Sequence, residues 1–68
     1  MKISARNQIR GRVQAITQGQ AAANVEIDAN GLRLVASITT ESVRELGLAE
    51  GSEVTAIIKA SDVIVAVD

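Results

Sequence analysis

Three short polar clusters contain the residues whose types are best suited to binding chemistry. They are Ser4-Ala5-Arg6-Asn7, Thr39-Thr40-Glu41-Ser42 and Lys59-Ala60-Ser61-Asp62. Arginine offers a planar fork of donors, lysine a point charge, and serine and threonine adaptable hydroxyls, while a helix start offers free backbone N–H groups. One arginine and one lysine also balance a dianion. The inventory therefore favours a site for a small oxyanion.

Each of these residues has an ordinary structural role as an alternative. A serine or threonine before a helix is most often its N-cap, which applies to Thr39 or Thr40. Arg6 and Lys59, taken alone, are more often solvated charges at strand ends. A calcium site is disfavoured because the eight carboxylates show no calcium-loop spacing, and no run fits the glycine-rich loop that binds nucleotide phosphates.

The composition excludes most enzyme classes. The chain has no histidine and no cysteine, which removes the usual proton shuttle at neutral pH and the usual thiolate nucleophile. Its formal charge of −1 gives no general positive field toward duplex DNA or anionic lipid, and no aromatic residue is present to stack on bases. We therefore expect no catalysis, and no nucleic acid or membrane as partner. Nothing in the sequence resembles a signal peptide or a membrane span, so we expect a cytoplasmic location.

The length of 68 residues predicts one domain that gains stability from other copies of itself. A core of this size is a marginal source of stability, and neither disulfides nor histidine and cysteine metal ligands are available to add to it. Aliphatic residues and alanines must form that core, because the chain lacks Phe, Trp and Tyr. Association of copies is the remaining option.

Alternation of apolar residues predicts five short strands. The alternating positions are Val13, Ala15 and Thr17; Ala23, Val25, Ile27 and Ala29; Leu32, Leu34, Ala36 and Ile38; Val54, Ala56 and Ile58; and Val63, Val65 and Val67. Gly19 supplies the first turn, and Asn30-Gly31 predicts a tight hairpin of type I′.

Between the third and fourth strands the period becomes helical. Val43, Leu46 and Leu48 fall at helical spacing, Thr39 or Thr40 is placed to cap the start of the helix, and Gly47 is placed to end it. Five strands with one short helix predict a mainly β fold, a small closed or nearly closed barrel.

The three polar clusters, in their order along the chain, resemble those of the molbindins, which are small molybdate-binding proteins with the Mop or TOBE domain. Related domains recur in molybdate transporter ATPases and molybdate-responsive regulators. The likeness covers essentially all 68 residues and is strongest in three stretches. These are Ile3 to Asn7 with Gly11 and Val13, Ser37 to Thr39 with Ser42 and Leu46-Gly47-Leu48, and Gly51 with Ile57 to Val63.

The resemblance implies an OB-like barrel whose subunits share or swap strands, in a hexamer built as a trimer of dimers. Molybdate or tungstate is then held at subunit interfaces, without an organic cofactor or direct metal ligands, for molybdenum storage or homeostasis. The residues expected to contact the oxyanion are Ser4, Arg6, Thr39, Ser42, Lys59, Ala60 and Ser61, with Ala60 acting through its backbone. Ala5 and Asn7 are expected to support them.

Two other classes of function stay open. The first is a DNA-binding regulator of the small swapped-hairpin kind, whose turn-and-strand signature resembles Leu46-Gly47-Leu48, Gly51 and Val54. Such domains normally place basic residues on one face, whereas basic and acidic residues are scattered here. The second alternative is an assembly domain that keeps the fold without a ligand. Equilibrium dialysis against molybdate, tungstate and sulfate separates the three.

Overall fold

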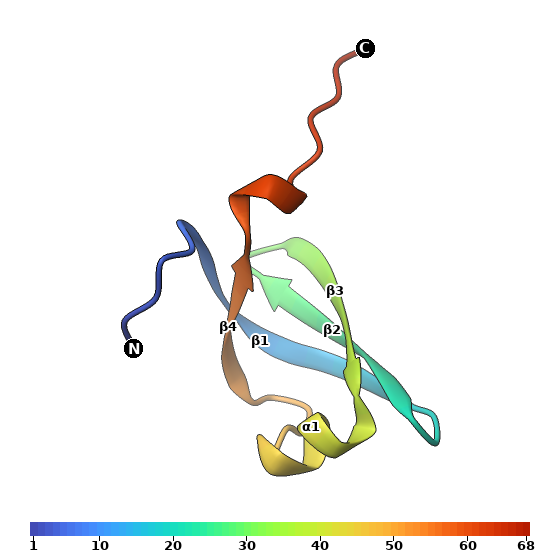
Figure 1. Ribbon diagram of the computed structural model, residues 1–68. Helices are drawn as coiled ribbons and strands as arrows, with labels where there is room; N and C mark the ends of the chain where they lie inside the picture. The colour runs from blue at the N-terminus through green and yellow to red at the C-terminus, as the bar shows by residue number, and fades with distance from the viewer.

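One curled antiparallel sheet forms the body of the protein in the computed structural model, which describes all residues from 1 to 68 (Figure 1). The elements are β1 (Asn7–Gln18), β2 (Ala22–Ala29), β3 (Leu32–Thr39), the helix α1 (Thr40–Glu45), β4 (Glu53–Ile58) and the 3-10 turn η1 (Ala60–Asp62). The strand order is β3-β2-β1-β4. The prediction of a mainly β fold with one short helix is confirmed, and the sheet has the shape of a half-barrel.

Strand β1 joins the two halves of the sheet. Its residues from Asn7 to Arg12 pair with β4, and those from Arg12 to Gln18 pair with β2. A side chain at Gly11 would place its Cβ 2.7 Å from Ile27 Cγ2 and 2.8 Å from the Asp28 carbonyl oxygen. Glycine therefore allows β1 to pass close to β2 where it changes partner.

A β-bulge between Val13 and Ala15 changes which face of β1 is buried. Val13 is buried as predicted, but after the bulge Ile16 pairs with the buried Val25 and packs against the core. Ala15 and Thr17 therefore lie on the other face, and their predicted place in the alternation is wrong because an inserted residue reverses it. The strand also begins at Asn7, six residues before the predicted alternation.

The core contains only aliphatic side chains. The alternation predicted for β2 is confirmed in full, since its four apolar positions are all buried. Val13 and Val43 complete the buried set, and partly buried residues of β3 and β4 pack against it. Leu32 at the start of β3 is exposed, in contrast to the prediction, because it lies next to the hairpin turn.

The predicted hairpin and helix boundaries are confirmed. Asn30 and Gly31 have φ of 55° and 92°, the positive values that the turn between β2 and β3 requires. Thr39 is the N-cap of α1, and Gly47, at φ 64°, follows its C-cap Leu46. Leu46 itself is 68% exposed and does not join the buried face that was predicted for it. No helix in the chain is both long and apolar enough to cross a bilayer.

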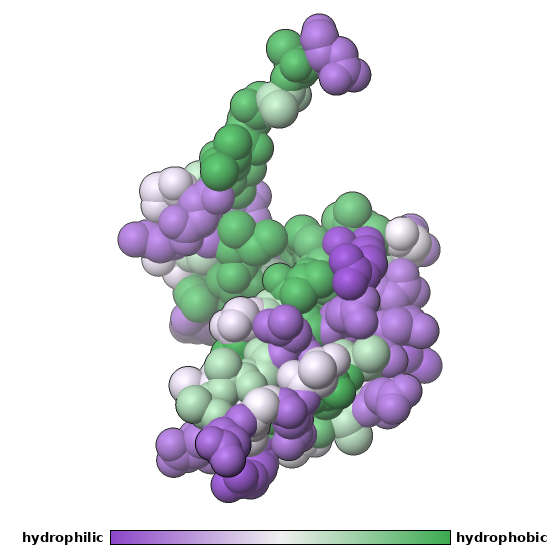
Figure 2. Space-filling view, turned by 90° about the vertical axis from the view of Figure 1, so that its right-hand side faces the viewer, coloured by the Kyte–Doolittle hydropathy of each residue, from purple (hydrophilic) through white to green (hydrophobic).

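The predicted fifth strand is absent from the sheet of its own chain. Residues 63–68 follow η1 as a tail without strand pairing, and Ile64 and Val67 are each 93% exposed. Figure 2 shows this tail projecting from the body, with hydrophobic residues along most of its length. The apolar residues of the tail suit a strand, but the tail pairs with no strand of its own chain, so the predicted five strands are four.

Candidate functional site

The first and third polar clusters meet at the end of the sheet where β1 begins and β4 ends. Asn7 pairs with Ile58 in the last step of the β1–β4 ladder, and the next step of the same register would set Arg6 opposite Lys59. Asn7 Nδ2 also donates a hydrogen bond to the Ile58 carbonyl oxygen at 3.1 Å. The ladder therefore brings two cations from distant parts of the sequence to one place.

Two short turns carry the remaining residues of these clusters. Gln8 Nε2 donates to the Ala5 carbonyl oxygen at 3.0 Å, which ties the segment containing Ser4 to the start of β1. On the other side, Asp62 N donates to the Lys59 carbonyl oxygen at 2.9 Å and closes the turn η1. We call the exposed set formed by Ser4, Arg6, Lys59, Ala60 and Ser61 the cationic half-site.

The middle cluster divides into one structural threonine, Thr40, and a pair of hydroxyls that contact each other at the start of α1. Thr40 is buried, and its Oγ1 donates to the Gly19 carbonyl oxygen at 2.9 Å, which fixes α1 against the β1–β2 turn. Thr39 Oγ1 accepts from Ser42 N at 3.0 Å and lies 2.7 Å from Ser42 Oγ. In the second contact the Thr39 hydroxyl donates to Ser42 Oγ, so the proton of the Ser42 hydroxyl is the one left for a ligand. Thr39 and Ser42 form the hydroxyl half-site.

The two half-sites lie at opposite ends of the sheet. The cationic half-site adjoins Asn7 at the start of β1, whereas Thr39 pairs with Ala22 beside Gln18, the last residue of β1. Eleven residue steps of β1 separate these ends, which spans up to about 36 Å at roughly 3.3 Å per residue. Figure 1 shows η1 at one end and α1 at the other. One chain therefore does not bring all the predicted residues together.

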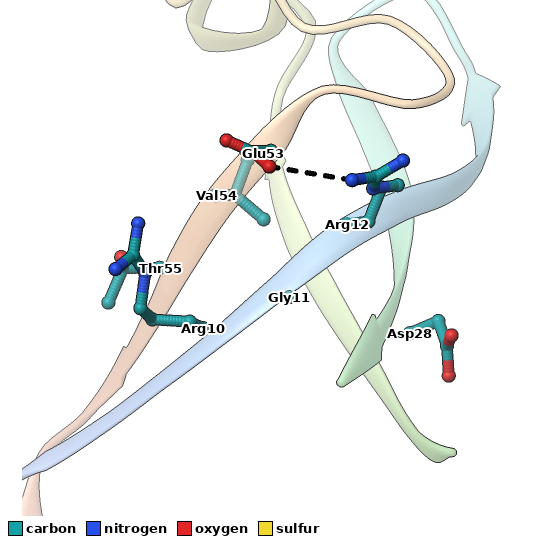
Figure 3. Close-up of a pocket in the computed structure, with 7 residues that line it drawn as sticks. All are labelled: Arg10, Gly11, Arg12, Asp28, Glu53, Val54 and Thr55. Carbon is teal, nitrogen blue, oxygen red and sulfur yellow. Dashed lines mark hydrogen bonds and ion pairs between the residues drawn. The ribbon is translucent and has the colours of Figure 1, made fainter. Parts of the chain in front are cut away.

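The main surface hollow lies elsewhere, on the face shared by β1 and β4 (Figure 3). It has a volume of about 570 Å³ and contains none of the predicted site residues. Its two arginines are matched by two acids, and Arg12 Nη2 lies 3.4 Å from Glu53 Oε1. Sequence analysis did not select Arg10 and Arg12, although they alternate on the exposed face of β1. Because the charges cancel, this hollow does not suit an anion.

Comparison with known proteins decides the family. The family model of the TOBE domain matches residues 3–65. The chain belongs to the TOBE domain family. The resemblance to molbindins inferred from the three polar clusters is thereby confirmed, since this TOBE chain is 44% identical over 66 residues to molybdenum-pterin-binding protein 1 of Clostridium pasteurianum. That alignment covers 96% of this chain and 97% of the relative.

Two solved structures share the TOBE fold described above. A molybdate-binding protein from Sporomusa ovata is 42% identical and superposes with a TM-score of 0.93, covering 97% of this chain and 98% of that one. The cytoplasmic molybdate-binding protein ModG, solved with molybdate bound, is 49% identical with a TM-score of 0.85. That match covers 88% of this chain and 43% of ModG. Both neighbours are named for binding molybdate.

Proposed function

We propose that this protein binds molybdate or tungstate in sites that two copies of the chain complete together, and that it is not an enzyme. The observation that carries the proposal is the separation of the cationic from the hydroxyl half-site within one chain. A relative 44% identical is named for binding molybdenum-pterin, and two structural neighbours are named for binding molybdate. The proposed domain spans residues 1–68.

In the proposed site, Arg6 and Lys59 of one copy approach Thr39 and Ser42 of another. The guanidinium fork and the ammonium neutralise the dianion, while the hydroxyls and the backbone N–H of Ala60, beside Ser61, complete the set of donors. Ser4 lies on the same segment as Arg6 and adds a hydroxyl. Partial burial between copies strengthens these charge-assisted hydrogen bonds by excluding water.

Size discriminates molybdate from sulfate in this proposal. The two dianions share charge and shape, but molybdate is larger. Donors that the sheet and α1 hold at a spacing matched to the larger anion therefore favour molybdate over sulfate. Titration calorimetry with molybdate, tungstate and sulfate tests this directly. Heat of binding for the first two and none for sulfate at the same concentration is the expected result. Equal affinity for sulfate, or no binding of molybdate, would remove the proposal.

The exposed tail supports association between copies through an exchanged strand. Its residues from Val63 to Val67 are all apolar, four of them β-branched as is common in strands, and they leave the body next to η1 (Figure 2). The sheet has two unpaired edges, β3 and β4, which can accept another strand. We propose that the tail of one copy joins the sheet of a second copy in a homo-oligomer, a hexamer arranged as a trimer of dimers.

Removal of residues 63–68 tests the exchanged strand. Light scattering should show the full chain as an oligomer and the truncated chain as a monomer, while circular dichroism reports whether the four-stranded body stays folded. Because the sites need two copies, molybdate should also raise the melting temperature of the full chain and leave that of the truncated chain unchanged. An oligomeric truncated chain would exclude the tail as the link.

The proposed biological role is storage and homeostasis of molybdenum in the cytoplasm. Support comes from ModG, whose structure is described as that of a cytoplasmic molybdate-binding protein. Elemental analysis of the protein purified from cells grown with and without added molybdate tests the role. Molybdenum that co-purifies in proportion to the supply is expected, whereas metal-free protein under both conditions would argue against storage.

A further inference from the structure

The turn between β2 and β3 contains a pair of residues whose chemistry the proposed function does not use. Asn30 and Gly31 form this turn, and both are exposed. An asparagine side chain that precedes glycine can react with its own backbone, because glycine carries no side chain to hinder the approach of its nitrogen. A Cβ built at Gly31 would have no atom within 4 Å, so neighbouring segments leave the turn open to water.

The reaction converts the Asn30 amide to a carboxyl group and needs only water. The backbone nitrogen of Gly31 gives its proton to solvent and bonds to Asn30 Cγ, while the Cγ–Nδ2 bond breaks and Nδ2 leaves as ammonia. Water then opens the cyclic imide. Cleavage at Cγ gives an ordinary aspartate, whereas cleavage at the backbone carbonyl carbon gives an isoaspartate, in which the main chain runs through the former side chain. Nothing is oxidised or reduced.

The Asp28 carboxylate binds the nitrogen that must attack. Gly31 N donates a hydrogen bond to Asp28 Oδ1 at 3.0 Å. Arg12 and Arg33 lie opposite Asp28 in the two ladders, but each forms its ion pair with a glutamate instead. Figure 3 shows the side chain of Asp28 directed away from Arg12. The carboxylate of Asp28 is therefore bonded to the turn and not to an arginine.

This hydrogen bond disfavours the reaction in two ways. The nitrogen attacks only after it has lost its proton, and the bond to Asp28 holds that proton in place. Loss of the proton would also put a negative charge on an atom 3.0 Å from a carboxylate oxygen, and like charges at this distance repel each other. In addition, the pairing of Ala29 with Leu32 holds the turn in one conformation.

We propose that Asn30-Gly31 is a site of non-enzymatic deamidation, and that Asp28 suppresses the reaction while the hairpin is folded. The rate of conversion then depends on how often the hairpin opens locally. The products weaken the hairpin, since both add a negative charge near Asp28, and isoaspartate also lengthens the main chain of a tight turn. The inference needs neither an oxyanion nor a second copy of the chain.

Prolonged incubation of the full chain in mildly alkaline buffer, with and without urea, tests the site. Peptide mapping by mass spectrometry should show Asn30 converted to aspartate and isoaspartate severalfold faster in urea, where the bond to Asp28 is lost. Asn7 and Asn24 are internal controls, because residues with bulky side chains follow them, and they should keep their amides. An Asn30 amide that lasts as long in urea as those of Asn7 and Asn24 would remove the site.

The variant Asp28→Ala tests the protection. Without urea, and folded by circular dichroism, it should convert Asn30 severalfold faster than the unmodified chain, whereas in urea the two chains should react at the same rate. Glu26→Ala is the matched control, since it removes the neighbouring acid on the same face of β2 and leaves the bond between Asp28 and Gly31. Equal rates for folded Asp28→Ala and the unmodified chain, or equal acceleration by Glu26→Ala, would overturn the role of Asp28.

The variant Asn30→Gly tests the effect of the products on stability. Glycine removes the reactive amide and adopts the positive φ of this position readily. After incubation in urea and refolding, the melting temperature of the unmodified chain should be lower than before, and that of Asn30→Gly should be unchanged. An equal decrease in both chains would show that deamidation at Asn30 does not weaken the hairpin.

Discussion

The amide of Asn7 donates a hydrogen bond to the carbonyl oxygen of Ile58 at 3.1 Å, across the last step of the β1–β4 ladder. The next residues of the two strands are Arg6 and Lys59. This bond therefore ties together the two chain segments that carry the cations of the proposed site. Asn7 was expected from the sequence to support the site. Its hydrogen bond is placed to do this by holding together the segments that carry Arg6 and Lys59.

Substitution of Asn7 by alanine should weaken oxyanion binding indirectly. Loss of a single hydrogen bond typically costs about 0.5–1.5 kcal/mol, and here the loss loosens the start of β1 beside the end of β4. Titration calorimetry should show a severalfold lower affinity for molybdate. Gln14→Ala provides a control, since Gln14 is an exposed amide on β1 outside both half-sites. Equal effects of both substitutions would mean that the Asn7 bond has no special role.

Arg6 should contribute more to binding than any one hydroxyl. Arg6→Ala removes a charge-assisted fork, typically worth about 1.5–3 kcal/mol, whereas Ser42→Ala removes one neutral donor. Calorimetry on both variants checks that the loss of molybdate affinity is larger for Arg6→Ala than for Ser42→Ala. Arg33→Ala is the matched control, because its exposed ion pair with Glu26 lies away from both half-sites and is worth little. Similar losses for Arg6 and Ser42 would contradict the ranking.

Glu41 should oppose the anion. It lies two residues from Thr39 in the first turn of α1, so its carboxylate adds negative charge beside the hydroxyl half-site. Glu41→Gln keeps the size of the side chain and should raise the affinity for molybdate, most clearly at low ionic strength where screening is weak. Glu50→Gln, farther along the loop, is the control. An unchanged or lower affinity for Glu41→Gln would show that this carboxylate does not face the ligand.

Gly11 should be intolerant of a side chain for a steric reason. The Cβ of Gly11→Ala would meet the Asp28 carbonyl oxygen at 2.8 Å, and a backbone atom of a paired strand cannot move away readily. Overpacking of this kind typically costs about 1–3 kcal/mol. Urea denaturation measures the loss, and Gly19→Ala, with its nearest neighbour at 3.1 Å, should cost less. An unchanged free energy of unfolding for Gly11→Ala would mean that β1 and β2 move apart easily beside Gly11.

The sequence predicts well those elements whose pattern depends on one local face. The four apolar residues of β2 alternate, so they can all be buried only if they lie on the same face of a strand. Asn30-Gly31 is one of few residue pairs that tolerate two consecutive positive φ angles. The cap at Thr39 and the end at Gly47 are equally local. The bulge after Val13 is not, because it reverses the alternation without leaving a distinctive residue type.

The tail shows why the rest of the fold could not be predicted. Val63, Val65 and Val67 alternate like a strand, but alternation does not say which chain supplies the neighbouring strand. The half-sites present the same problem. Residue types at Arg6, Lys59 and Thr39 indicate oxyanion chemistry, whereas the distance between them depends on the strand pairing along β1.

A mixture of two defective variants tests most directly whether one site is made by two copies. One variant lacks Arg6 (Arg6→Ala) and the other lacks both hydroxyls of α1 (Thr39→Ala with Ser42→Ala). In a two-fold dimer of one copy of each, one site carries both defects and the other carries none.

Titration calorimetry on the two variants, alone and after co-refolding in equal amounts, provides this measurement. Each variant alone should lack high-affinity molybdate binding, and the random mixture should recover about a quarter of the sites at the affinity of the unmodified chain. If the mixture binds no better than its components although the two variants co-assemble, the residues of each site belong to one copy, and the shared site is contradicted.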